Sequence, residues 1–215
     1  MVNQIKIEQL SAILDVLKLA EKLKFELRHS WLSNGRQESV AEHTWRMSLM
    51  AVLIEPLLDE KIDLSRLLKM IIIHDLVEAE AGDVSVLDQI RNPDVKKIKQ
   101  QNEEKAISNI KEMLTSTNGQ EIYDLFYEFE EKDTFEAKVA NAIDKLEVQL
   151  QHNHADISTW EEIEYDLSFV IGKHVQFDDT FVVLKDLIEK QAEQKLEDAG
   201  LNVSEIRNRA IASFS

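Results

Sequence analysis

Histidine and aspartate residues stand on or beside the apolar faces of three expected helices. The segment Leu64–Glu80 carries an apolar stripe with helical spacing, formed by Leu64, Leu67, Leu68, Ile71 and Ile72. The next position of that stripe is Asp75, and in the expected helix Val40–Ile54 one place on the stripe is taken by His43. A buried carboxylate without a partner is costly or takes up a proton, so Asp75 requires a cation.

His74 precedes Asp75 and lies about 100° away around the same helix axis, so near a helix end both side chains can reach one cavity. A third expected helix, Thr134–His152, places Asp144 just beside its apolar face. With His43 these residues offer two imidazoles and two carboxylates, which suit one divalent Mn, Co, Fe, Mg or Zn ion. Four protein ligands leave room on a six-coordinate ion for water and a phosphate oxygen, which predicts metal-assisted phosphate ester hydrolysis.

Two further carboxylates are candidates for proton transfer. Glu78 lies four residues after His74 and three after Asp75, so it can face the same site. Asp83 follows Gly82 just past the expected helix end, where its side chain can turn back toward the cavity. We expect either one to act as general acid or base.

Two arginines precede the expected His43 helix. The planar guanidinium groups of Arg28 and Arg36 match phosphate oxygens in a way that lysine does not, so both are candidates for substrate binding. Arg36 has a structural alternative, since it could pair with Glu38 or Glu42. Three other histidines, His152, His154 and His174, fit no ligand spacing and are interpreted as surface residues or as residues behind the ligands.

The chain as a whole predicts one all-α domain. With 5 Gly and 2 Pro in 215 residues, it has few of the turns that an all-β fold needs. Periodicity and punctuation predict helices over Ile5–Leu23, Val40–Ile54, Leu64–Glu80, Asp94–Leu114, Glu121–Glu131, Thr134–His152, Thr159–Ile171 and Asp179–Ala199. We expect a single domain over residues 1–215, with a core at about 10–195 and a C-terminal helical extension.

Composition excludes several classes of partner. The formal net charge is −16, from 25 basic and 41 acidic residues, so nucleic acid polymers and anionic membranes are poor partners. The apolar runs are too short to span a membrane, and the N-terminus does not resemble a signal peptide. There is no cysteine, which agrees with a cytoplasmic protein. A small anionic substrate remains compatible, because one arginine and one metal ion can govern a pocket locally.

Three segments carry a family resemblance. They are RHSWLSNGRQESVAEH at 28–43, HDLVEAEAGD at 74–83, and VANAIDKLE around Asp144. Together they resemble the HD-domain superfamily of metal-dependent phosphohydrolases, and more narrowly its 5′-deoxynucleotidase branch and the HD-domain-containing protein 2 family. The resemblance extends over about residues 10–195.

The resemblance implies an all-α homodimer that holds one divalent metal per subunit and releases phosphate from deoxynucleoside 5′-monophosphates with Co²⁺ or Mn²⁺. Matched by position, it assigns the metal to His43, His74, Asp75 and Asp144. It assigns substrate binding to Arg28, and catalysis or substrate binding to Glu78 and Asp83; His43 is also expected beside the substrate. His29 stands where bacterial deoxynucleotidases tend to have Trp, and Trp31 follows, so sugar and base preference stay open.

The functional hypothesis is therefore a metal-dependent 5′-nucleotidase acting on a small nucleotide. Two alternatives remain at this point. One is an HD-type phosphodiesterase or pyrophosphohydrolase for signalling nucleotides, although the extra histidine pair typical of two-metal diesterases is missing. The other is a non-catalytic helical module that senses a nucleotide, although such a module has no chemical reason to keep buried carboxylates.

Overall fold

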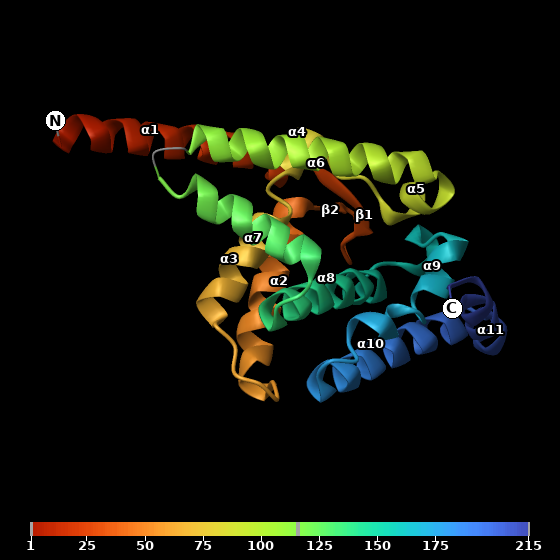
Figure 1. Ribbon diagram of the computed structural model, residues 1–215. Coiled ribbons are helices and arrows are strands. Elements are labelled where there is room, and N and C mark those ends of the chain that lie inside the picture. Colours follow the sequence, from red (N-terminus) through yellow and green to blue (C-terminus); the bar gives the residue numbers. More distant parts are fainter. Residues whose placement is uncertain (1, 115–116, 215) are drawn as a thin grey trace.

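The computed structural model describes residues 2–114 and 117–214 and consists almost entirely of helices (Figure 1). In chain order the α-helices are α1 (Val2–Ala20), α2 (Val40–Ile54), α3 (Leu64–His74), α4 (Glu78–Ala81), α5 (Val86–Arg91), α6 (Pro93–Met113), α7 (Gly119–Glu131), α8 (Phe135–His154), α9 (Glu162–Leu167), α10 (Asp179–Asp198) and α11 (Val203–Phe214). Short 3-10 helices are η1 (Glu21–Lys24), η2 (Glu55–Leu57), η3 (Ile157–Thr159) and η4 (Ile171–His174). The all-α prediction is confirmed.

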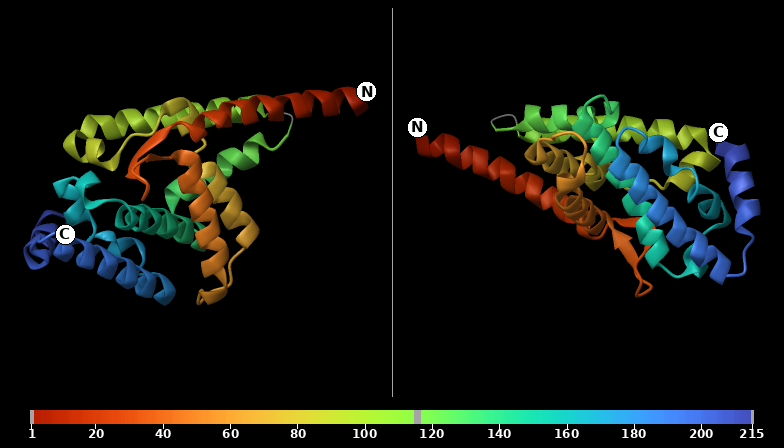
Figure 2. Two further views of the ribbon diagram at one scale, coloured as in Figure 1. Left: turned by 180° about the vertical axis from the view of Figure 1, so that it is seen from behind. Right: turned by 90° about the horizontal axis from the view of Figure 1, so that it is seen from below.

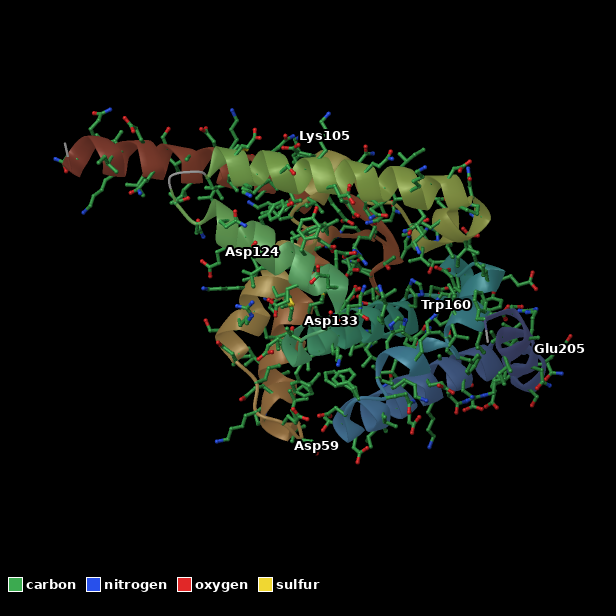
Figure 3. The ribbon with its side chains drawn as sticks, viewed as in Figure 1. Asp59, Lys105, Asp124, Asp133, Trp160 and Glu205 are labelled. Carbon is green, nitrogen blue, oxygen red and sulfur yellow. The ribbon has the colours of Figure 1, made fainter. Side chains whose placement is uncertain are left out.

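The helices form layers around α8. Figure 1 and Figure 2 show α1 and α6 along one edge, α2, α3 and α7 beside one end of α8, and α9 to α11 on its other side. Charged side chains such as Lys105, Asp124 and Glu205 are exposed on the outer faces (Figure 3). None of the helices in the described ranges is long and apolar enough to cross a lipid bilayer.

The largest apolar core lies where α2, α3, α7, α8 and α10 meet. Its fully buried members include Met47 from α2, Leu67 and Ile71 from α3, Ile143 from α8 and Phe181 from α10. The side chain of Asp63 accepts a hydrogen bond from the Arg66 backbone N–H, so it caps α3 as its sequence position predicts. This core fixes the relative positions of the helices that carry the candidate ligands.

A short hairpin was not expected from the sequence. Strands β1 (Leu27–Trp31) and β2 (Gln37–Ser39) pair antiparallel, and Gly35 in the connecting turn has a positive φ of 84°. The hairpin leads into α2 through a capping box, in which Ser39 and Glu42 satisfy each other's backbone N–H groups. The Asn-Gly pair marked the turn, but the strands are too short to show a clear alternating pattern.

The predicted single helix Leu64–Glu80 is wrong in its second half. Helix α3 ends at His74, Asp75 is its C-cap, and α4 starts a new helical segment at Glu78. The buried face also differs from the predicted stripe, because Met70 and His74 are buried while Ile72 is 56% exposed. His74 therefore occupies the core-facing stripe, and Asp75 reaches the site because the helix ends there.

The predicted helix Thr159–Ile171 is also wrong, since this region is divided among η3, α9 and η4. Between η3 and α9 the helix is interrupted, and Glu161 caps the start of α9 in a capping box with Glu164. Helix α11 lies in the region where the C-terminal helical extension was expected. Helix α5, which had no predicted counterpart, is short because Pro93 follows it and begins α6.

Gly82 turns the chain out of α4 and toward Asp83. Its φ of 78° and ψ of 154° lie in a region that is essentially restricted to glycine. The Asp83 backbone N–H then donates a hydrogen bond to Glu26 Oε1 at 3.0 Å, which holds the turn in place. The backbone at Gly82 thus sets the position of a candidate catalytic carboxylate.

We expect Gly82→Ala to lower the free energy of unfolding by about 1–3 kcal/mol, because any side chain is strained at that φ and ψ. The measurement is equilibrium denaturation in urea. Gly172→Ala is the matched control, since Gly172 has no positive φ and an added Cβ would meet nothing closer than 3.9 Å. Equal effects of the two substitutions would contradict this explanation.

Candidate metal centre

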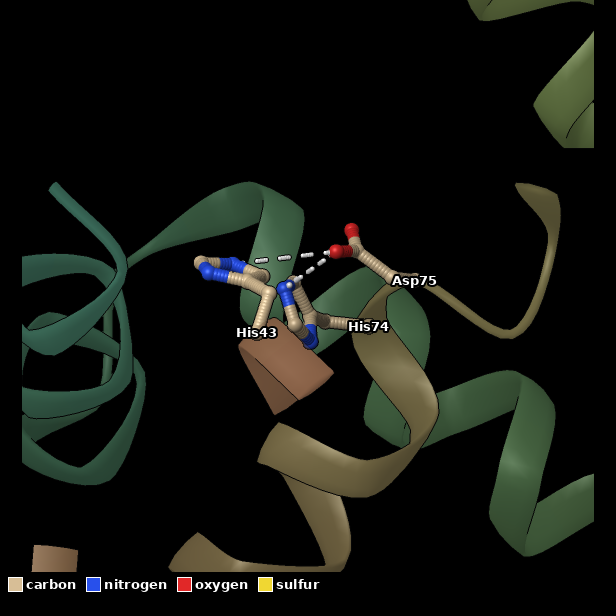
Figure 4. Close-up of side chains that lie close together, drawn as sticks. All are labelled: His43, His74 and Asp75. Atoms are coloured by element: carbon tan, nitrogen blue, oxygen red, sulfur yellow. Dashed lines mark ion pairs between the residues drawn. The ribbon is translucent and has the colours of Figure 1, made fainter. Parts of the chain in front are cut away.

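Three candidate ligands converge at the junction of α2 and α3. One ligand atom each from His43, His74 and Asp75 lies within 4.8 Å of the others (Figure 4). Asp75 Oδ2 is 3.1 Å from His74 Nε2 and 3.8 Å from His43 Nε2. His43 is fully buried and His74 is nearly so, so these polar groups are held away from bulk water.

The hydrogen bonds of both imidazoles leave Nε2 available as a ligand. His74 Nδ1 lies 2.7 Å from the carbonyl oxygen of Ile71, an acceptor only, so Nδ1 carries the proton and donates it. His43 Nδ1 lies 2.5 Å from Glu147 Oε2, which likewise accepts the proton. Both Nε2 atoms are buried and neither makes a hydrogen bond of normal geometry. Orphaned imidazole nitrogens beside a carboxylate fit a divalent metal ion.

Asp144 lies next to this trio. Its Oδ1 is 3.2 Å from His43 Nε2, and its Oδ2 is 2.7 Å from Lys145 Nζ, so Lys145 holds the oxygen that does not face the histidine. Burial and the charge of Arg28 act to lower the pKa of His43, but Glu147 and Asp144 outweigh them and raise it to about 9. The carboxylates therefore favour positive charge at this position, which a bound divalent ion would supply.

Both predicted acid–base residues lie near the trio. Glu78 is buried, its Oε2 has no hydrogen-bond partner, and Lys99 Nζ is 3.8 Å from its Oε1. Burial, together with the charges of Asp75 and Asp83, raises the pKa of Glu78 well above its ordinary value. Burial also raises the pKa of Asp83, against the opposing charge of Arg28. A raised pKa makes a carboxyl group better suited to act as a general acid.

Of the two predicted arginines, the structure brings only Arg28 to the site. Arg28 Nη1 donates a hydrogen bond to Asp75 Oδ2 at 3.3 Å. Arg36 instead forms a paired hydrogen bond to Glu42 at 2.9 and 2.6 Å, and its side chain is 52% exposed. This pairing is the structural alternative for Arg36, and no contact among the described residues places its guanidinium near the ligands. The hairpin turn directs this side chain toward the first turn of α2.

A buried polar network behind His43 was not predicted from the sequence. Besides accepting from His43, Glu147 accepts a hydrogen bond from Arg46 Nε at 2.6 Å through Oε1 and is fully buried. Glu38 is also buried and lies 3.9 Å from both Arg28 and Arg46. Glu147 follows Ile143 by four residues, so a carboxylate on the apolar face of α8 could have revealed it, as it did Asp75.

Glu38, His43 and Glu147 also cluster within 4.8 Å and could in principle hold a cation. Arg46 and Arg28 already supply positive charge there, since Arg46 Nη2 lies 2.6 Å from Glu147 Oε1 and Arg28 lies 3.9 Å from Glu38. His43 Nδ1 also carries a proton on that side. These features favour the Nε2 side of His43 as the metal site.

A cavity of about 560 Å³ opens beside the ligands, between α8, β1, α5 and the segment from α9 to η4. Its wall includes the predicted residues Arg28, Asp83 and Asp144. Its charged side chains are the cationic Arg28, Lys96, Lys145 and Lys173 and the acidic Asp83, Asp144 and Glu164, so cationic groups are in slight excess there although the protein as a whole is acidic. The cavity thus has the volume and charge to take a small anionic molecule.

Two histidines that fit no ligand spacing also line this cavity, namely His152 and His174. His152 is not a surface residue, since its side chain is 12% exposed and its ring packs against Trp160 at 5.5 Å between centroids. Its Nε2 lies 3.4 Å from Ser30 Oγ. Burial lowers the pKa of His152 to about 4. His152 is therefore neutral at physiological pH.

Replacing the carboxylate behind His43 is expected to weaken metal binding. Glu147→Gln removes the charge that favours the Nε2-ligating form of His43, so we expect the affinity for Mn²⁺ to fall about 10- to 100-fold by isothermal titration calorimetry. The control is Glu128→Gln, whose carboxylate pairs with Arg66 on the surface. Unchanged affinity in a folded Glu147→Gln protein would refute the role of Glu147.

The lowered pKa of His152 predicts that the free energy of unfolding depends on pH. Its folded pKa of about 4 lies below the ordinary 6.5. Between these values the unfolded chain binds a proton that the folded chain does not, so stability falls as the pH drops from 6.5 to 4. In His152→Gln this slope should become shallower by up to about 1.4 kcal/mol per pH unit, measured by urea denaturation. The exposed His154→Gln should change the slope less; equal changes would contradict the assignment.

Comparisons with known proteins identify relatives in sequence and in fold. Human 5′-deoxynucleotidase HDDC2 is 31% identical over 156 residues, which are 72% of this chain and 71% of that protein. A 5′-deoxynucleotidase HDDC2 from Dictyostelium discoideum is 36% identical over 149 residues, 66% of this chain and 76% of that protein. A crystal structure described as a predicted metal-dependent phosphohydrolase, from Magnetospirillum magnetotacticum MS-1, superimposes with a TM-score of 0.72 and 25% identity, covering 90% of this chain and 98% of that chain.

Residues 20–184 match the HD domain family, a span that contains the candidate ligands His43, His74, Asp75 and Asp144 together with Arg28. The same span contains the buried network around Glu147. The sequence match and the helical fold thus lead to the same assignment. The chain belongs to the HD domain family.

Proposed function

We propose that the protein is a metal-dependent 5′-nucleotidase that releases phosphate from deoxynucleoside 5′-monophosphates, with His43, His74, Asp75 and Asp144 as the metal ligands. One observation carries the proposal. Two buried imidazole nitrogens without hydrogen-bond partners and two aspartates meet beside a cavity that also contains Arg28. The relatives named 5′-deoxynucleotidase support the reaction and the class of substrate.

A divalent ion in this site, such as Mn²⁺ or Co²⁺, would lower the pKa of a bound water and neutralise phosphoryl oxygens. Arg28 is placed to bind the phosphate, because it lies beside Asp75 and its guanidinium faces the cavity. Its fork holds the phosphate in one orientation, which reduces the entropy lost at the reacting centre.

Glu78 and Asp83 provide for proton transfer. The raised pKa of Glu78 favours the protonated form of a carboxyl group beside the ligands, from which the leaving sugar oxygen can take a proton. Asp83 lines the cavity and is positioned by Gly82, so it can accept a hydrogen bond from a sugar hydroxyl or from the attacking water. Glu78 would then donate a proton, and Asp83 would accept a hydrogen bond or a proton.

The direct test is phosphate release from ribo- and deoxynucleoside 5′-monophosphates by metal-stripped protein re-supplied with Mn²⁺, Co²⁺, Mg²⁺ or Zn²⁺. We expect metal-dependent release that is lost in Asp75→Ala and reduced about 10²- to 10⁴-fold in kcat in Glu78→Gln. Exposed Glu131→Gln is the control. Hydrolysis of phosphodiesters but of no monophosphate would overturn the monoesterase assignment.

We infer in addition that the protein is a cytoplasmic homodimer, as is usual in the family that it resembles. Helix α2 supports this inference, because it exposes a row of apolar side chains with helical spacing: Trp45 (66%), Leu49 (41%), Val52 (46%) and Leu53 (64%). Contiguous apolar faces of this kind are typical of protein interfaces. A twofold dimer would pair this face with itself.

Trp45→Glu is expected to convert the dimer to a monomer, because it places a charge on the apolar face of α2 at its most exposed member. The measurement is size-exclusion chromatography with light scattering. Leu187→Glu, at a site 58% exposed on α10, is the control and should leave the mass unchanged. A wild-type monomer at micromolar concentration would contradict the dimer.

A further inference from the structure

Helix α11 contributes to the wall of the cavity although it lies outside the residues that match the HD domain family. Its buried residues Val203, Ile206 and Ala210 follow helical spacing and form one face. Phe214 continues that face four residues after Ala210 and lines the cavity. The face that attaches α11 to the protein therefore ends in an aromatic ring that lines the cavity.

Helix α11 is held firmly in this position. Val203 and Ile206 pack in an apolar cluster with Trp160 and with Leu196 of α10. Arg209 Nε donates to the Asp166 carboxylate at 2.8 Å, and Arg209 Nη1 donates to Glu162 at 3.0 Å, which ties α11 to α9. These contacts fix the C-terminal turn of the helix, so the position of Phe214 relative to α9 follows from packing.

The other apolar part of the cavity wall comes from α5. Val86 and Ile90 line the cavity and are 54% and 41% exposed, although both are large apolar residues. Leaving such surface in water is unfavourable, and here it lies in the same cavity as a half-buried phenylalanine. An apolar, planar group bound in the cavity would cover these side chains.

We propose that Phe214, together with Val86 and Ile90, forms the subsite for the nucleobase and determines how strongly the protein prefers nucleotides over simple sugar phosphates. The proposal rests on the proposed function. The same cavity contains Arg28 and Asp144, so a substrate whose phosphate lies at the ligands extends its base into the remaining volume. An aromatic ring can stack on the π-face of any nucleobase, whichever base it is.

The polar residues of this region fit the same occupant. Gln149 and His152 line the cavity, and the low pKa of His152 keeps its ring neutral. A neutral imidazole and an amide can exchange hydrogen bonds with the edge of a base without favouring one charge. Lys145 is paired with Asp144, and the two other lysines of the cavity, Lys96 and Lys173, have no role with a neutral base and are available to an anionic group.

The test compares Phe214→Ala with Ile211→Ala, the control on the same helix, where the side chain is 60% exposed. Substrates are a deoxynucleoside 5′-monophosphate and 2-deoxyribose 5-phosphate, which has the same sugar phosphate without a base. Phe214→Ala should raise KM for the nucleotide about tenfold, the effect of losing one base stack, with little change in kcat. KM for the base-free substrate should not change, and Phe214→Trp should restore nucleotide binding.

Binding of 2′-deoxyadenosine, measured by NMR titration, separates this proposal from the proposed reaction. The nucleoside has no phosphate, so weaker binding to Phe214→Ala than to Ile211→Ala supports the base subsite even if no phosphate is released from any substrate. Absence of release would overturn the reaction alone. Equal binding of the nucleoside to both variants, or an equal rise in KM for both substrates, would overturn the base subsite.

Discussion

The arrangement of this protein depends on the cost of burying two imidazoles and several carboxylates at one point. His43 and Glu147 are fully buried, and His74, Glu78 and Asp144 are nearly so. Polar groups in such surroundings are stable only when hydrogen bonds or opposite charges satisfy them. The helices are arranged to provide those partners, and the Nε2 atoms that remain unpaired mark where a metal ion would complete the set.

The partners form a continuous layer behind the ligands. Arg46 orients Glu147, Glu147 orients His43, and Arg28 reaches Asp75 from the hairpin. Burial and the nearby Glu147 raise the pKa of Glu38 to about 7, so this layer tolerates a protonated carboxyl group between two arginines. Because each member holds the next, the geometry of the ligands is set before substrate or metal arrives, as catalysis by positioning requires.

Much of the site was readable from sequence because buried polar residues contradict helical periodicity. That signal identified His43 directly, but Asp75 was identified for a partly wrong reason, since it caps α3 instead of lying on its stripe. The hairpin determines where the side chains of Arg28 and Arg36 lie. Helical periodicity contains no information about this hairpin. The role of Phe214 in the cavity wall could not be predicted from the sequence either. The segments that enclose a cavity are determined by long-range packing.

The central claim is that His43, His74, Asp75 and Asp144 hold one divalent ion on the Nε2 side of His43. Anomalous diffraction from Mn²⁺-soaked crystals, collected near the manganese edge, tests it most directly. The account predicts a single strong peak bounded by the two Nε2 atoms and the two aspartates, with Lys145 still on the outer oxygen of Asp144. A peak between Glu38 and Glu147, or no peak at the four ligands, would contradict it.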